Sequence, residues 1–89
     1  MITQHFDQVV EHVRSSNNDE QVPQAVQLEI YGLYKQATEG DVKGSKPSRI
    51  KLVSRTKYEA WAACKGMSTQ DAMQGYIDRV GQYLVAGVK

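Results

Sequence analysis

Four stretches of the chain repeat hydrophobic residues at the spacing of one helix face. The first predicts a helix from Thr3 to Arg14, with Thr3 as its cap. The second follows Pro23, which suits the first turn of a helix, and runs to Thr38 or Glu39. The repeated positions are Phe6, Val9, Val10 and Val13 in the first stretch and Val26, Ile30, Leu33 and Ala37 in the second.

The other two stretches lie in the second half of the chain. Ser54 is a good cap for a helix that ends at Lys65, and Ser68 starts a variant capping box for a helix from Thr69 to Val85. Their hydrophobic positions are Tyr58, Trp61 and Ala62, then Ala72, Met73, Tyr76, Ile77, Val80, Tyr83 and Leu84. Trp61 is expected in the core, and the single cysteine, Cys64, as a small buried hydrophobe.

The connections differ in length. A short polar segment, residues 15–21, joins the first two helices, and Gly40 is placed to end the second helix in a left-handed cap. Residues 41–53 then form a long loop, which we expect Ile50, Leu52 and Val53 to hold against the bundle. No strand pattern is present, so the sequence predicts one domain, residues 1–89, with an all-α four-helix bundle in which the second and third helices run parallel.

Charge is distributed unevenly, although the net charge is only +1. Residues 1–42 hold two basic and seven acidic side chains, whereas residues 43–57 hold six basic ones and no acidic one. This pattern fits either a solvated loop or a local anion site. The balance gives no support for a nucleic-acid binder, and the sequence shows neither a secretory signal nor an apolar run long enough to span a membrane.

One face of the second predicted helix carries an unusual mixture of side chains. Leu28, Tyr31, Tyr34 and Lys35 place an apolar patch, two phenols and an ammonium group within two turns. Such a face suits a ligand with an aromatic ring, an anionic group and an apolar part, because phenols and ammonium groups donate to phosphate. Taken singly, each residue has an ordinary structural explanation. Gly32 costs the same helix up to ~1 kcal/mol, and room for a neighbouring helix is one explanation for it.

Enzyme motifs are absent from the sequence. There is no Gly-rich phosphate loop, HExxH, GxSxG or CxxC. His5 and His12 lack a third metal ligand, and Cys64 lacks a partner for nucleophilic chemistry. We therefore expect no catalytic residue, no metal and no cofactor, and a binding module explains the residues better than an enzyme.

Three separated segments resemble one family. Residues 31–41 (YGLYKQATEGD) resemble the YxxYKQATxGD signature of the acyl-CoA-binding protein family. Residues 57–61 (KYEAW) and 71–77 (DAMQGYI) resemble its KWxAW and DAMxxYI segments, and Phe6 matches an early Phe of the family. The resemblance covers nearly the whole chain. It implies an up-down-down-up bundle that binds long-chain acyl-CoA esters one to one, without catalysis.

The resemblance also implies roles for individual residues. Tyr31, Lys35 and Lys57 match positions that hold the 3′-phosphate of the CoA ribose. Tyr34 and Tyr76 match positions at the adenine and near the nucleotide. Arg14 matches a basic position that is usually Lys, and Leu28 matches the acyl-chain groove, beside Ile30. Weaker candidates for the site are Gly32, Leu33, Val53 and Arg55.

Several positions depart from the family pattern. Tyr58 replaces a Trp, Leu52 replaces a Phe, and the loop between the first two helices is two residues longer than the commonest form. Val53 stands where a Lys is frequent, so one phosphate contact is missing or Arg55 supplies it. These changes bear on affinity and chain-length preference.

The resulting hypothesis is a monomeric carrier that transports or buffers long-chain acyl-CoA and meets acyl-CoA-using enzymes transiently. We expect it in the cytoplasm, with an organelle as the other location, and expect neither nucleic-acid binding nor stable membrane insertion. Two alternatives stay open. One is an acyl-CoA-binding domain from a larger enzyme or scaffold, and the other is a helical module whose basic loop docks an acidic protein.

Overall fold

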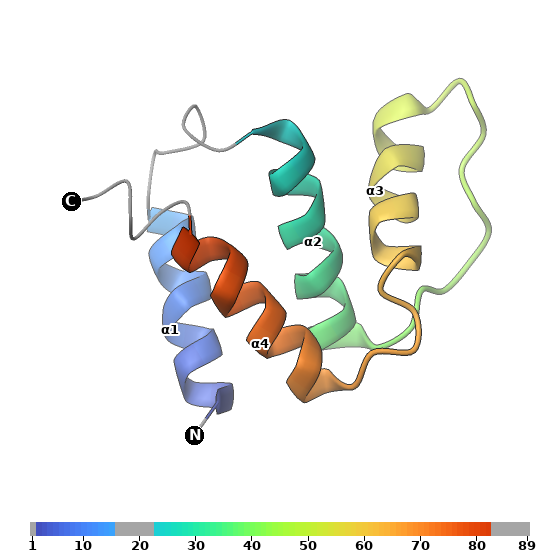
Figure 1. Cartoon of the computed structure of the whole chain (residues 1–89). Coiled ribbons are helices and arrows are strands. Elements are labelled where there is room, and N and C mark those ends of the chain that lie inside the picture. Colours follow the sequence, from blue (N-terminus) through green and yellow to red (C-terminus); the bar gives the residue numbers. More distant parts are fainter. Residues whose placement is uncertain (1, 16–22, 83–89) are drawn as a thin grey trace.

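The computed structural model describes residues 2–15 and 23–82, with side chains for residues 2–13 and 23–82. These residues form four helices and no strand: α1 (Ile2–Ser15), α2 (Gln24–Glu39), α3 (Leu52–Ala62) and α4 (Thr69–Val80). In Figure 1, α1 lies beside α4, α2 packs between α4 and α3, and α3 forms the outer edge. The prediction of an all-α four-helix bundle is confirmed.

The helices follow an up-down-down-up order. Figure 1 shows α2 and α3 running in the same direction, with the connection between them passing back along the outside of α3. A connection of this length allows two consecutive helices to lie parallel, whereas short loops force neighbours to be antiparallel. The predicted parallel arrangement is therefore present.

The core lies between α1, α2 and α4. Its ring contacts centre on Phe6, which meets Tyr76 edge to face at 5.1 Å and stacks with Tyr34 at 6.2 Å between ring centroids. No residue of α3 is buried, so α3 adds little to this cluster. The buried members of the core are Phe6, Val26, Ala37, Ala72, Met73, Tyr76 and Val80.

α3 is attached to the bundle through a close approach to α2. A Cβ atom placed on Gly32 would lie 2.3 Å from the carbonyl oxygen of Ala60 and 3.3 Å from Cys64 Sγ. Only glycine permits this backbone separation, which explains why the chain tolerates Gly32 inside a helix. Cys64 is buried as predicted, and burial raises the pKa of its thiol.

Several predicted helix ends are wrong by a few residues. α1 begins at Ile2, so Thr3 lies inside the helix, and α3 begins at Leu52, so Ser54 is not its cap. Gly40 has a φ of 81° but a ψ of −152°, which is not a left-handed helical cap, and its N–H donates to the carbonyl of Gln36.

At the other ends, α3 stops at Ala62, and a turn continues to Gly66. The cap at Ser68 is confirmed, because its Oγ accepts from the Asp71 N–H at 3.0 Å. The predicted end of the fourth helix at Val85 lies outside the described residues.

Two predictions about burial are also wrong. Ile50, Leu52 and Val53 do not hold the loop against the bundle, since they are 94%, 67% and 69% exposed. Ile50 lies just before α3, and Leu52 and Val53 open this helix, which is the outer one of the bundle and packs chiefly against α2. For the same reason Trp61 is half-buried rather than in the core, and its Nε1 donates to the Gly40 carbonyl at 2.8 Å.

We predict that Gly32→Ala destabilises the fold by about 1–3 kcal/mol, because the added methyl group forces α2 and α3 apart. Urea unfolding followed by circular dichroism measures the change. Gly81→Ala is the matched control, since a Cβ at Gly81 meets nothing within 4 Å. Equal stability of the two variants would contradict the packing role of Gly32.

Candidate functional site

The seam between α2 and α3 pairs cations with aromatic rings. The Nζ atom of Lys57 in α3 lies 5.5 Å from the ring centroid of Tyr31 in α2. One turn further along both helices, the Nζ atom of Lys35 in α2 lies 4.8 Å from the ring centroid of Trp61 in α3. Because the helices are parallel, residues one turn apart on each helix meet in matching order. The structure thus brings Tyr31, Lys35 and Lys57 to one seam.

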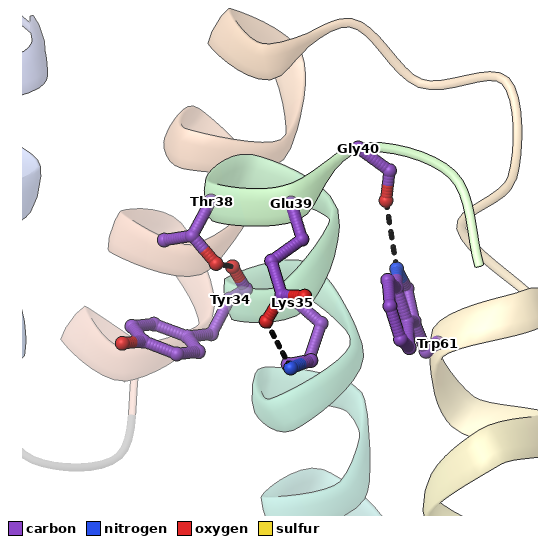
Figure 2. Close-up of polar contacts among 6 residues, drawn as sticks. All are labelled: Tyr34, Lys35, Thr38, Glu39, Gly40 and Trp61. Carbon is purple, nitrogen blue, oxygen red and sulfur yellow. Dashed lines mark hydrogen bonds and ion pairs between the residues drawn. The ribbon is translucent and has the colours of Figure 1, made fainter. Parts of the chain in front are cut away.

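The ammonium group of Lys35 has two partners. Its Nζ donates to Glu39 one turn later in α2, and it faces Trp61 across the seam (Figure 2). The hydrogen bond to Glu39 raises the pKa of Lys35, and the same contact lowers the pKa of Glu39. An anion that binds Lys35 must therefore compete with a carboxylate already in place.

A groove continues from these residues along the N-terminal halves of α2 and α3. Its volume is about 310 Å³, and it is partly apolar. Leu28 and Tyr31 face it from α2, and Val53 and Lys57 face it from α3. The complete lining is Gln24, Gln27, Leu28, Tyr31, Leu52, Val53, Thr56 and Lys57.

Tyr34 projects from α2 in a different direction from Lys35 (Figure 2). Figure 2 shows its ring pointing away from Trp61, and it stacks instead on Phe6 at 6.2 Å. The buried ring of Tyr76 lies 6.3 Å from Tyr34. Tyr34 and Tyr76 therefore share an aromatic cluster with Phe6, between α1, α2 and α4, whereas Tyr31 belongs to the α2–α3 seam.

The remaining candidate residues occupy different places. Ile30 and Leu33 pack against the core, so the structure places Ile30 away from the groove. The guanidinium of Arg55 lies 3.7 Å from Glu59 and donates to the Pro47 carbonyl at 3.2 Å, so Arg55 is engaged beside the groove and does not line it. Arg14 is in the last turn of α1, and its side chain is outside the described part of the chain.

Sequence reasoning missed several residues of this region. Gln24, Gln27 and Thr56 line the groove. Gln24 precedes Leu28 by four residues and Gln27 precedes Tyr31 by four, so the stripe through Leu28 and Tyr31 could have been extended to them. Glu39 stands four residues after Lys35, which is the spacing of an ion pair, and this signal was not used.

A buried amide fixes the end of α2 to the turn before α4. Gln36 is 1% exposed, and its Nε2 donates to Asp41 Oδ1 at 2.8 Å and to the Met67 carbonyl at 3.0 Å. The Gly66 N–H donates to the same oxygen of Asp41 at 2.9 Å. The hydrogen bond from Gly66, and to a smaller extent that from Gln36, holds the pKa of Asp41 below its ordinary value. These contacts hold together the end of α2, which follows Lys35, and the turn after α3, which follows Trp61.

The described residues contain neither a candidate metal site nor a candidate membrane-spanning helix. They contain no group of three or more His, Cys, Asp or Glu side chains that could hold a metal ion. None of the helices in residues 2–15 and 23–82 is long and apolar enough to cross a bilayer. The site combines two lysines, aromatic rings and a partly apolar groove, an arrangement whose chemistry suits an amphipathic anion.

Comparison with known proteins identifies the class to which this fold and site belong. Residues 3–80 match the model of the family described as Acyl CoA binding protein. The chain therefore belongs to the acyl-CoA-binding protein family.

Similar proteins and structures agree with this assignment. The chain is 49% identical over 57 residues to the acyl-CoA-binding protein of Ricinus communis, covering 64% of this chain and 63% of that protein. It is 48% identical over 61 residues to acyl-CoA-binding domain-containing protein 4 of Oryza sativa, covering 68% of this chain but only 18% of that longer protein. The crystal structure of Oryza sativa acyl-CoA-binding protein 2 superposes with a TM-score of 0.89 at 33% identity, covering 99% of this chain and 96% of that one.

We predict that the hydrogen bonds to Asp41 make stability depend on pH. Because its pKa is lower in the folded state, Asp41 stabilises the fold above its ordinary pKa of 3.8, and this contribution is lost as the pH falls through the folded-state pKa. Asp41→Asn should lower the Tm at neutral pH, and the difference from the wild type should shrink below about pH 4. Thermal melts of wild type and Asp41→Asn between neutral pH and below about pH 4 measure this difference, with Asp7→Asn on the exposed face of α1 as control. A difference that does not change with pH would contradict it.

Proposed function

We propose that this chain binds long-chain acyl-CoA esters one to one and carries or buffers them in the cytoplasm, without catalysing a reaction. The observation that supports this most directly is the seam in which Lys35 and Lys57 lie against aromatic rings at one end of a partly apolar groove. An acyl-CoA has the matching parts, since it joins phosphates and an adenine to a hydrocarbon chain. The names of the relatives point to the same ligand.

The phosphate end of the ligand would bind at the seam. The ammonium groups of Lys35 and Lys57 and the hydroxyl of Tyr31 can donate to the 3′-phosphate of the ribose, and such charge-assisted bonds are about twice as strong as neutral ones. Tyr34, which is half-buried, would contact the adenine, whereas Tyr76 is 3% exposed and would lie near the nucleotide only as core support beside Tyr34. Arg14 would add a cation from α1.

The acyl chain would lie in the groove, where Leu28, Leu52 and Val53 provide apolar surface. Burying about fifteen methylenes at ~0.8 kcal/mol each gives on the order of 12 kcal/mol before costs. Association and ordering of the chain cost roughly 4–15 kcal/mol. Nanomolar binding needs ~12 kcal/mol net, so the nucleotide end must contribute.

The wider role is proposed on the same basis. Residues 1–89 would act as one monomeric binding domain that needs no cofactor and meets acyl-CoA-using enzymes only transiently. The chain spans 18–22% of the length of several plant relatives and 63% of the Ricinus communis protein, so the activities of those whole proteins are not carried over.

We predict that Lys35→Ala weakens palmitoyl-CoA binding more than Leu28→Ala does. Losing a hydrogen bond to a charged group costs about 1.5–3 kcal/mol, whereas Leu28 is only half-buried and gives up part of its apolar contact. Isothermal titration calorimetry of both variants with palmitoyl-CoA measures the ranking. A larger loss for Leu28→Ala would reverse the assignment of the dominant contact.

The control for this experiment is the 3′-dephospho analogue of palmitoyl-CoA. The wild type should bind it more weakly, and Lys35→Ala should weaken its binding little further. Equal binding of both ligands by the wild type would remove the phosphate site while keeping the groove. Absence of heat with either ligand would overturn the proposed function.

We also predict that Glu39→Gln strengthens palmitoyl-CoA binding severalfold. The substitution removes the carboxylate that pairs with Lys35, so the phosphate no longer competes with it. Titration with the dephospho analogue should show a smaller gain. Glu29→Gln is the matched control, because Glu29 pairs with Arg79 and not with Lys35. An equal gain in both variants would indicate a general charge effect.

A further inference from the structure

Three large hydrophobic side chains project from the start of α3. Ile50, Leu52 and Val53 are 94%, 67% and 69% exposed, and they are the exposed large hydrophobics of residues 2–13 and 23–82. Leu52 and Val53 belong to the groove already described, but Ile50 is not among its lining residues. A ligand in the groove would therefore leave the Ile50 side chain unexplained.

The same short segment carries positive charge. Arg49 and Lys51 flank Ile50, both are exposed, and neither has an ion pair within the described part of the chain. Two other cations of the basic stretch, Lys46 and Arg55, already lie beside Glu59. No acidic residue occurs between positions 43 and 57, so nothing in the local sequence offsets Arg49 and Lys51.

We propose that residues 49–53, the docking edge, bind the surface of an anionic lipid bilayer. Such a surface offers negative headgroups and, a few ångströms deeper, hydrocarbon, so neighbouring cationic and aliphatic side chains are satisfied together. Acidic groups on a protein would account for the charges alone, whereas a bilayer also offers continuous hydrocarbon to a side chain that is 94% exposed. The combination therefore favours the bilayer.

The position of the docking edge also orients the groove. Leu52 and Val53 belong to the edge and to the groove lining, so docking brings the groove mouth to the membrane. An acyl chain could then enter from the lipid without crossing water. This consequence rests on the proposed function, whereas docking itself does not.

Vesicle co-sedimentation of the ligand-free protein tests the proposal. The wild type should bind vesicles of phosphatidylcholine mixed with phosphatidylserine, and should not bind vesicles of phosphatidylcholine alone. Lys51→Glu should weaken binding about tenfold or more, and Ile50→Asn about tenfold. Lys65→Glu, an exposed lysine in the turn after α3, is the matched charge control and should bind like the wild type.

Two results would overturn the proposal. One is a wild type that fails to bind anionic vesicles. The other is Ile50→Asn that binds them like the wild type, which would leave a purely electrostatic surface of the kind an acidic protein uses. Circular dichroism melts establish that each variant is folded. Palmitoyl-CoA titration of Ile50→Asn should be unchanged, so loss of vesicle binding and failure of the proposed function are observed separately.

Discussion

The close approach of α2 and α3 at Gly32 is the contact on which the site depends. α3 contributes no buried residue of its own, so its position is set by how near it can come to α2. At this separation Lys57 reaches the ring of Tyr31, and Lys35 reaches the ring of Trp61. A larger separation would break both contacts and widen the groove between the helices. A residue without a side chain therefore determines where the charged and aromatic side chains meet.

The helices and their parallel central pair could be predicted from the sequence, because helical spacing and loop length are local properties. Burial was harder to predict. A hydrophobic pattern identifies side chains that avoid water but not whether another element covers them, and at Ile50 none does. The ends were wrong at Thr3 and Ser54 because side chains that can cap a helix need not do so.

The candidate site could be predicted in part. Tyr31 and Lys35 are one turn apart, so their shared face followed from spacing alone. The position of Lys57 beside Tyr31 could not be predicted from spacing, because this contact depends on packing between the helices. Spacing grouped Tyr34 with the same face. In the structure that face is shared between two neighbours of α2: Tyr31 and Lys35 lie against α3, whereas Tyr34 packs on Phe6 of α1. Glu39 was recognisable by spacing and was overlooked.

The parallel arrangement of α2 and α3 also aligns their dipoles. Both helices begin at the same end of the molecule, and neither has an acidic residue in its first turn or a side-chain cap. The free N–H groups there add partial positive charge to that of Lys51 and Lys57. An acidic first turn would stabilise either helix by about 0.3–1 kcal/mol, but it would also cancel this field. The chain therefore combines a positive potential at this end with a stability below what ordinary capping would provide.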